Sequence, residues 1–283
     1  MRTLLAIAAA LSLSAPASAD HHGGSAAAPS PREIAAARAA ALGDSHRTAA
    51  DRSRDAWRHP AQTLAFFKVD PGMTVVDYMP TGGWWTRVLV PYLGTGGRYI
   101  GVNPDVSAAA ERMKQMFGNM AATFPAKAAE WTGAPAERIA GYNTDGLPAT
   151  LNGTVDRVLI FRELHNLWRL NLLRSELLAM RALLKPDGLL GIEQHRAKAN
   201  APAEYTDGNK GYLRERDVIA LVEAHGFALV GKSDINANPR DPANHANGVW
   251  VLPPGFRDGD KDRARYEAIG ESDRMTLLFR KRP

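Results

Sequence analysis

Two places in this 283-residue chain gather side chains that can move protons. Glu163 and His165 follow an apolar run at 156–161, and His195 follows a second apolar run at 189–193. An imidazole titrates near neutral pH, so either His could take a proton from a hydroxyl or amine of a bound molecule. Polar residues at strand ends also hydrogen-bond loop backbones, and each His taken singly fits that structural role equally well. As a group, these residues favour a functional site.

A third candidate is a glycine turn, Pro80–Trp84, that follows the apolar segment ending at Asp77. Glycine permits a tight bend and a close approach to the backbone, and in nucleotide-binding folds a helix begins after such a turn. Only Gly82 and Gly83 are available and Pro80 lacks an amide donor, so a G-x-G-x-x-G cradle for pyrophosphate is not expected. A ligand without a phosphate needs less, because Asp77 could position a cation while the two glycines lie against an adenosine moiety. A strand-to-helix turn with no ligand is the alternative interpretation.

A regular alternation of apolar strands and helices must position these residues. The expected strands are Thr74–Met79, Tyr99–Asn103, Arg138–Tyr142, Asp156–Phe161, Leu189–Glu193, Ala228–Asn236 and Met275–Arg280. The expected helices between them are Trp84–Tyr92, Ser107–Phe117, Leu170–Leu184 and Glu215–Ala224, preceded by one from Pro60 through Phe67. Pro186-Asp187-Gly188 is expected to make the turn before the fifth strand.

Strands that alternate with helices predict an α/β, Rossmann-like fold, with a seven-stranded, mostly parallel sheet and helices on both faces. The last two expected strands have no convincing helix between them, so the last strand should be antiparallel. Ligands bind beyond the carboxyl ends of the strands in such sheets. We therefore expect the glycine turn and the polar residues after the fourth and fifth strands to meet in one cleft.

Short motifs spread over most of the chain carry a resemblance to a known family. They are WRHP at 57–60, PTGGWWT at 80–86, FRELHN at 161–166, QHRA at 194–197, GY at 211–212, NPRD at 238–241, WVLPP at 250–254 and GESDRM at 270–275. Together with the strand pattern, these motifs resemble class I S-adenosylmethionine-dependent methyltransferases. More narrowly, the chain is similar to a family of exported bacterial proteins predicted to be methyltransferases. The match covers nearly all residues from Trp57 onward.

The resemblance implies where the methyl donor, S-adenosylmethionine, would bind. The turn that holds Asp77, Pro80, Gly82 and Gly83 would meet its methionine end. The second strand of the class usually ends in an acidic residue that holds the ribose hydroxyls, and Asn103 stands there in this chain.

Three further positions bear on the donor. Asp145 is the nearest candidate to meet the adenine amine. Met79 and Thr81 stand where the class pattern has glycine, so the turn departs from the pattern at two positions.

The activity implied is methyl transfer to a small-molecule acceptor, with His165, His195 and Glu163 as the catalytic residues. The alternative is a non-catalytic or repurposed protein that binds another small ligand on the same fold. A third interpretation is a metal-dependent enzyme that uses the two histidines with Glu163 or Glu193, although no H-x-x-x-H or H-x-H spacing supports it.

The N-terminal residues 1–19 have the three parts of a secretory signal peptide: Arg2, an apolar Leu/Ala run and Ala17-Ser18-Ala19 before the cleavage site. We therefore expect a periplasmic or secreted protein after cleavage near Ala19. S-adenosylmethionine is made in the cytoplasm, and export would favour the non-catalytic alternative. The chain has no Cys, which excludes disulfides and a thiolate nucleophile and suits an oxidising compartment.

Residues 20–50 are expected to be a flexible or helical leader, and residues 51–283 to form the methyltransferase-like domain. Cleavage would make Asp20-His21-His22 the new N-terminus, where an amine, backbone amides and an imidazole could bind Cu(II). An accidental polar leader is the favoured interpretation of these three residues.

The charged composition bears on which classes of partner the protein could bind. Without Arg2 of the signal peptide, the 35 Lys and Arg residues become 34, against 30 Asp and Glu. These charges are scattered, without a basic run of the kind that binds nucleic acid, so no nucleic-acid partner is expected. Beyond the signal peptide no apolar stretch is long enough to suggest a membrane span.

Overall fold

The computed structural model describes residues 29–283, so the predicted signal peptide and the Asp20-His21-His22 segment lie outside the described residues. One sheet has the strand order β3-β2-β1-β4-β5-β7-β6. Its strands are β1 (Thr74–Tyr78), β2 (Arg98–Asn103), β3 (Ile139–Asn143), β4 (Val155–Phe161), β5 (Leu184–His195), β6 (Phe227–Ser233) and β7 (Arg274–Lys281). The strand pairs are parallel except those of β7, which is antiparallel to β5 and β6. This order and the antiparallel β7 confirm the predicted fold.

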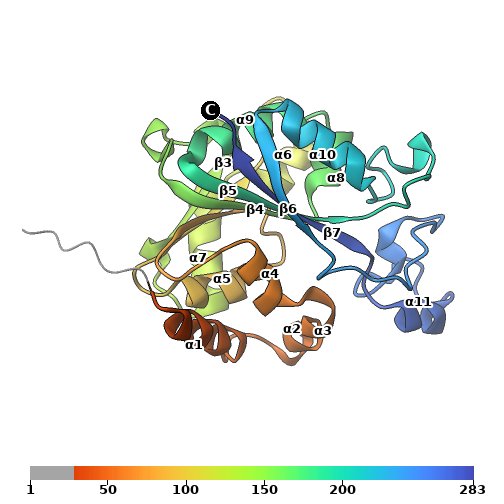
Figure 1. Ribbon diagram of the computed structural model, residues 1–283, viewed down its shortest axis with the longest axis horizontal. Helices are drawn as coiled ribbons and strands as arrows, with labels where there is room; N and C mark the ends of the chain where they lie inside the picture. Colours follow the sequence, from red (N-terminus) through yellow and green to blue (C-terminus); the bar gives the residue numbers. More distant parts are fainter. Residues whose placement is uncertain (1–28) are drawn as a thin grey trace, which may run out of the picture.

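Helices cover both faces of the sheet (Figure 1). They are α1 (Pro31–Leu42), α2 (Ala49–Ser53), α3 (Asp55–Arg58), α4 (Pro60–Phe66), α5 (Thr86–Leu93), α6 (Glu111–Phe117), α7 (Met120–Thr132), α8 (Leu164–Arg169), α9 (Leu173–Leu183), α10 (Glu215–Ala224) and α11 (Arg263–Ile269). The core on one face includes residues of α4, α5 and α7, and the core on the other face includes residues of α9 and α10. Each face of the sheet therefore buries its own apolar layer.

Strand β1 shows how the sheet separates the two cores. Val76 and Tyr78 are buried in the layer with α9 and α10, whereas Val75 is buried in the layer with α4 and α5. Side chains along a strand alternate between its faces, so Asp77 points to the same side as Val75. There it meets Tyr99 of β2. The alternation of side chains along β1 thus places the carboxyl group of Asp77 within an apolar layer.

Several predicted elements differ from those observed. The helix expected at Leu170–Leu184 is α9, which begins at Leu173; Asn171, whose φ of 57° is incompatible with a continuous helix, separates it from α8. The turn expected at Pro186-Asp187-Gly188 is wrong, because these residues lie within β5 as an irregularity opposite β4. The helix expected from Ser107 begins at Glu111.

Several helices were not among those expected, and α8, directly after β4, is one of them. Helix α7 follows α6 and packs against β3, and α11 lies in the connection between β6 and β7. Helix α11 is seven residues long, and after it β7 pairs antiparallel with β6, as expected.

Residues before position 51 also pack against the helices that cover the sheet. Ala41 of α1 is buried in the same core as α5. Arg47 is fully buried, and its Nη2 atom lies 2.5 Å from Oδ1 of Asp55. An ion pair thus joins the segment after α1 to α3.

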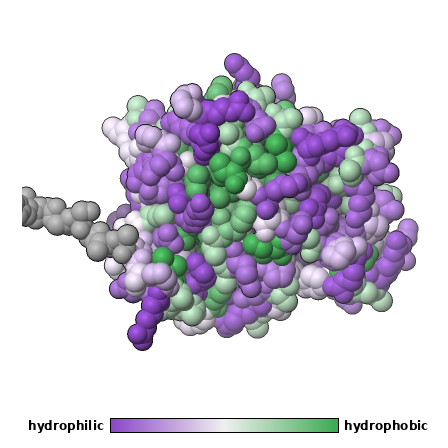
Figure 2. All heavy atoms as spheres, in the orientation of Figure 1, coloured by the Kyte–Doolittle hydropathy of each residue, from purple (hydrophilic) through white to green (hydrophobic). Residues whose placement is uncertain are grey.

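No helix within residues 29–283 combines the length and apolar character needed to cross a membrane. Figure 2 shows hydrophilic residues spread over one face of the molecule, around a smaller group of hydrophobic residues near its centre. The exposed large hydrophobic side chains include Met116, Trp168, Leu178 and Val230, which come from different elements. Single exposed apolar residues of this kind are ordinary on a protein surface.

Candidate functional site

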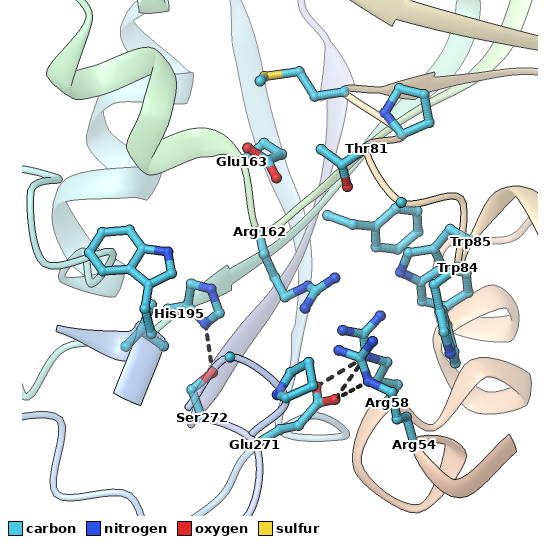
Figure 3. Close-up of a pocket in the computed structure, with 18 of the residues that line it drawn as sticks. Arg54, Arg58, Thr81, Trp84, Trp85, Arg162, Glu163, His195, Glu271 and Ser272 are labelled. Atoms are coloured by element: carbon cyan, nitrogen blue, oxygen red, sulfur yellow. Dashed lines mark hydrogen bonds and ion pairs between the residues drawn. The ribbon is translucent and has the colours of Figure 1, made fainter. Parts of the chain in front are cut away.

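A cavity of about 410 Å³ lies at the carboxyl ends of β1, β4 and β5. Its walls come from the turn after β1, the tips of β4 and β5, helices α2 and α3, and two C-terminal segments at 249–255 and 271–272. Figure 3 shows side chains from these segments facing one another across the cavity. The residues singled out from the sequence that line it are Asp77, Pro80, Gly82, Glu163, His165 and His195.

The turn after β1 keeps a glycine-like backbone at positions that are not glycine. Met79 has a φ of 54° and Thr81 a φ of 44°, both in the left-handed region. A non-glycine residue there costs about 1 kcal/mol or more. Met79 and Thr81 were the two departures from the glycine pattern of the class, so the chain has changed the side chains while keeping the bend.

Gly83 has a packing role in this turn. Its φ is 72°, and a Cβ built on it would lie 2.3 Å from the ring of Trp131 in α7. By contrast, a Cβ on Gly82 would meet nothing within 4 Å, and Gly82 lines the cavity whereas Gly83 does not. Of the two glycines that were expected to contact the ligand, only Gly82 is therefore placed to do so.

Asp77 lies at the floor of the cavity and is 1% exposed. The hydroxyl of Tyr99 donates a 2.7 Å hydrogen bond to its Oδ2 atom. Burial raises the pKa of Asp77 from 3.8 to about 7, although the hydrogen bond from Tyr99 acts in the opposite direction. The carboxyl group therefore changes its charge near neutral pH.

Glu163 at the tip of β4 has a similar electrostatic environment. Burial raises the pKa of its carboxyl group from 4.5 to about 7, partly opposed by a hydrogen bond from Asn166. The Asn166 Nδ2 atom lies 2.5 Å from Glu163 Oε2. A carboxylate with a pKa near neutrality is suited to accept a proton at physiological pH.

The two histidines differ from the expectation of a pKa near neutrality. Burial lowers the pKa of His165 from 6.5 to about 4, and it holds the pKa of His195 well below the ordinary value. The rings are close, with centroids 5.8 Å apart, and His195 Nδ1 lies 2.6 Å from the hydroxyl oxygen of Ser272. Both imidazoles are therefore neutral at pH 7 and act there as hydrogen-bonding groups.

Both tryptophans of the PTGGWWT motif line the cavity. Trp85 stacks on Phe161 with ring centroids 4.0 Å apart, and Trp84 donates a 3.0 Å hydrogen bond from its indole to the carbonyl of Asp51. The indole nitrogen of Trp85 is buried, and no residue in the described part of the chain accepts a hydrogen bond from it. The two rings make a rigid aromatic wall with one free donor.

Several arginines that the sequence did not mark as site residues also line the cavity. Arg54 and Arg58 come from the start of the domain, and Arg162 comes from the tip of β4. Arg58 and Arg162 lie within the WRHP and FRELHN motifs, so the resemblance marked their positions without giving them a role. No local pattern indicates that α3 reaches across to the carboxyl edge of the sheet.

Besides Gly83, two residues expected at the donor do not line this cavity, Asn103 and Asp145. The Asn103 side chain donates a 3.0 Å hydrogen bond to the carbonyl of Phe117, which ties it to the end of α6. Asp145 lies in an exposed turn after β3. The structure thus gathers Asp77, Pro80 and Gly82, expected at the methionine end, and leaves apart the residues expected at the ribose and adenine.

Within residues 29–283, no three His, Asp or Glu side chains are grouped so that they could hold a metal ion. His165 and His195 have protein partners instead, because Gln194 Nε2 approaches His165 Nδ1 at 3.5 Å and His195 contacts Ser272. The structure therefore offers no support for the metal-dependent interpretation.

Comparison with known proteins gives a likeness of fold. No protein-family model matches the chain, and no curated protein matches its sequence. Similar solved structures include a SAM dependent methyltransferase from Aquifex aeolicus, with a TM-score of 0.48 and 18% identity over 65% of this chain and 87% of that one. The [4+2]-cyclase SpnF has a TM-score of 0.48 and 16% identity, over 80% of this chain and 81% of that one. A 1,6-didemethyltoxoflavin-N1-methyltransferase from Burkholderia thailandensis has a TM-score of 0.44 and 17% identity, over 90% of this chain and 92% of that one.

These likenesses are distant, and the assignment of the fold rests on the strand order and the antiparallel β7 of this chain. That arrangement defines a Rossmann-like α/β fold with a seven-stranded, mostly parallel sheet.

Proposed function

We propose that this protein transfers a methyl group from S-adenosylmethionine to a small-molecule acceptor. One observation carries the proposal: a single cavity at the carboxyl edge of the sheet is lined both by the turn after β1 and by the polar tips of β4 and β5. Ligands of Rossmann-like proteins bind at this edge. Donor and acceptor could therefore meet within one cavity, and such proximity is the chief requirement for an in-line displacement.

The residues at one end of the cavity fit the methionine part of the donor. Gly82 leaves open space beside the backbone, and Asp77 supplies a buried carboxyl group near it. A carboxylate favours a nearby cation, so Asp77 suits the ammonium group of a methionine moiety. When bound, S-adenosylmethionine supplies an electrophilic methyl group on a sulfonium.

Glu163 is the side chain best suited to accept the proton that the acceptor loses. Its pKa of about 7 makes it available as a base near neutral pH, whereas His165, with a pKa of about 4, would be a weak one. His195 lines the same cavity and would orient the acceptor through a hydrogen bond. This assignment divides the three predicted catalytic residues into one base and two positioning groups.

Calorimetric titration of the purified protein with S-adenosylmethionine and S-adenosylhomocysteine tests donor binding. The sharpest variant is Gly82→Val, because position 82 has open space for the new side chain and lines the cavity. Gly146→Val is its control, since Gly146 has the same open surroundings and does not line the cavity. Binding that is lost in Gly82→Val and kept in Gly146→Val supports the proposal. Equal affinity in both variants contradicts it.

A repurposed small-ligand-binding protein is the second candidate, and one observation favours it. Asn103 donates to the Phe117 carbonyl and Asp145 lies apart from the cavity, so the expected contacts to ribose and adenine are missing from its walls. A folded wild-type protein that binds neither donor nor product up to millimolar concentration would establish this candidate instead.

We further propose that the protein acts after export to a bacterial periplasm. The signal-peptide pattern of residues 1–19 is the support for this location. Mass spectrometry of the periplasmic fraction should find a mature N-terminus at Asp20. A full-length chain found only in the cytoplasm would contradict export.

A further inference from the structure

Four arginines and two glutamates form a buried cluster beside the cavity. We call it the arginine cluster, and its members are Arg54, Arg58, Arg162, Arg274, Glu193 and Glu271. Figure 3 shows the guanidinium groups of Arg54, Arg58 and Arg162 gathered near Glu271, while Thr81 of the glycine turn lies across the cavity. These three arginines line the cavity, and Arg274 lies behind Glu271 and Glu193.

Glu271 is shared among three arginines. Arg54 Nε lies 2.7 Å from its Oε1 atom, Arg58 Nε lies 3.0 Å from Oε2, and Arg274 Nη1 lies 2.8 Å from Oε2.

Glu193 is the second carboxylate of the cluster. Its Oε1 atom lies 3.2 Å from Arg274 Nε and 4.0 Å from Arg162 Nε. Two carboxylates therefore face four guanidinium groups, and the cluster holds two positive charges that its own acids do not neutralise.

Uncompensated donors remain in the cluster. Arg58 is 1% exposed, and its Nη1 atom is buried with no hydrogen-bond partner in the described part of the chain. The same holds for Arg162 Nε. Leaving a buried donor without an acceptor costs about 1 to 3 kcal/mol and more for a charged group, so an anion that accepts a hydrogen bond from these atoms would be stabilised.

Arg162 is held toward the cluster by a strained backbone. Its φ is 65°, and its amide donates a 2.6 Å hydrogen bond to the carbonyl of Glu193. A large side chain in the left-handed region costs about 1 kcal/mol or more, and such residues gather at functional sites. The strain is therefore consistent with a side chain kept in place for a ligand.

We propose that the arginine cluster binds a carboxylate or phosphate group of the acceptor. This inference rests on the proposed function, because it names the class of acceptor for the same cavity. The cavity has two chemically different ends: Glu163 lies on the side of Thr81, and the guanidinium groups of Arg54 and Arg58 lie on the side of Glu271. The acidic end suits the cationic groups of the donor, and the basic end suits an anionic acceptor.

The carboxylate of the donor is the other possible occupant, and the experiment separates the two. We would titrate the purified protein with inorganic phosphate, with benzoate and, separately, with S-adenosylhomocysteine. The variants are Arg162→Gln and Arg54→Gln, whose side chains are each 23% exposed in the wild-type protein. Arg216→Gln is the control, because Arg216 is largely exposed on α10 and pairs only with Asp217 among the described residues.

We expect saturable binding of phosphate or benzoate that weakens about tenfold or more in Arg162→Gln and less in Arg54→Gln, with no change in Arg216→Gln. S-adenosylhomocysteine should bind with similar affinity to all of them. Circular dichroism shows whether Arg162→Gln is folded. If Arg162→Gln does not fold, the anion affinity of Arg54→Gln decides the test.

Three results would overturn the inference. No saturable binding of either anion to wild type is the first. Equal anion affinity in wild type, Arg162→Gln and Arg54→Gln is the second, and it would mean an adventitious ion only. The third is loss of S-adenosylhomocysteine binding in parallel with anion binding, which would assign the guanidinium groups to the donor carboxylate. Anion binding without any binding of S-adenosylhomocysteine would refute the proposed methyl transfer and keep the anion site.

Discussion

The hydroxyl of Tyr99 donates a 2.7 Å hydrogen bond to the buried carboxyl group of Asp77, and these two side chains belong to adjacent strands of the sheet. Thr86, in the first turn of α5, lies 2.9 Å from the same hydroxyl. Asp77 thus has one hydroxyl partner within an apolar layer, and burial raises its pKa to about 7. The carboxyl group at the floor of the cavity therefore changes its charge near neutral pH.

Asp77 makes the folded protein less stable as the pH rises. Its pKa is raised from 3.8 to about 7, so the folded state holds a proton that the unfolded state releases. The free energy of unfolding should fall between about pH 4 and about pH 8, with Asp77 contributing about 4 kcal/mol at most. Urea unfolding at pH 5 and pH 8 measures how steeply the free energy of unfolding falls with pH. This dependence should be weaker in Asp77→Asn.

Glu163 has a raised pKa too, so part of the slope should remain in Asp77→Asn. Glu163→Gln should remove much of that remainder. A slope that is unchanged in Asp77→Asn would show that this carboxyl group is ionised in the folded protein.

Thr81→Gly should relieve strain in the turn. Thr81 is exposed and has a φ of 44°, a backbone that glycine adopts freely. The loss of strain is partly offset by the greater freedom of glycine in the unfolded chain, so we expect a gain of up to about 1 kcal/mol. Thr123→Gly in helix α7 is the contrast, with an expected loss of about 0.5 to 1 kcal/mol. Denaturant titration compares the two, and equal losses would contradict strain at Thr81.

Gly83→Ala should destabilise the protein, whereas Gly82→Ala should not. A Cβ at position 83 would lie 2.3 Å from Trp131 and would require a φ of 72° in a non-glycine residue. We expect a loss of about 2 to 4 kcal/mol, while Gly82→Ala stays within about 0.5 kcal/mol. Thermal or urea unfolding of both variants checks this.

Trp131→Leu should restore part of the loss in Gly83→Ala, since it removes the ring that the new methyl group meets. A change at Gly83 therefore tests packing, and a change at Gly82 tests binding.

The fold could be predicted because its strands are apolar and bounded by turns. Val75 and Val76 are buried on opposite faces of the sheet, and an apolar run with no polar face indicates such a strand directly. Helix α7 could not be predicted with the same ease, because Pro125 lies inside it and alanines weaken its apolar stripe. The turn expected before the fifth strand lies inside β5, because Leu184 already pairs with Val155 of β4 and regular pairing resumes at Leu189.

The candidate site was predictable where it depends on sheet topology. The tips of β1, β4 and β5 meet at one edge, which is why Asp77, Glu163 and His195 line one cavity. Properties that depend on burial were not predictable: the lowered pKa of His165 comes from desolvation, which no spacing in the sequence encodes. Arg58 was missed for a similar reason, because its partner Glu271 lies 213 residues away.

Glu271→Gln should be strongly destabilising at neutral pH. Glu271 is buried, and the positive charges of Arg58 and Arg274 outweigh burial and hold the pKa of its carboxyl group well below the ordinary 4.5. Removing one partner of a buried ion pair costs about 3 to 5 kcal/mol, since the remaining charges stay buried. Glu267→Gln is the control, because Glu267 is an exposed residue of α11 whose pair with Arg263 contributes little.

The pH dependence of this loss has a definite sign. Because the pKa of Glu271 is lowered on folding, its stabilising effect is complete above the ordinary pKa of 4.5 and is lost as the pH falls toward the lowered value. The difference between wild type and Glu271→Gln in urea unfolding should therefore be largest near neutrality and shrink in acid. A difference that is constant with pH would mean that Glu271 acts through its shape. Since Glu271 joins α3 to the segment before β7, its loss should also loosen the wall of the cavity that the arginines form.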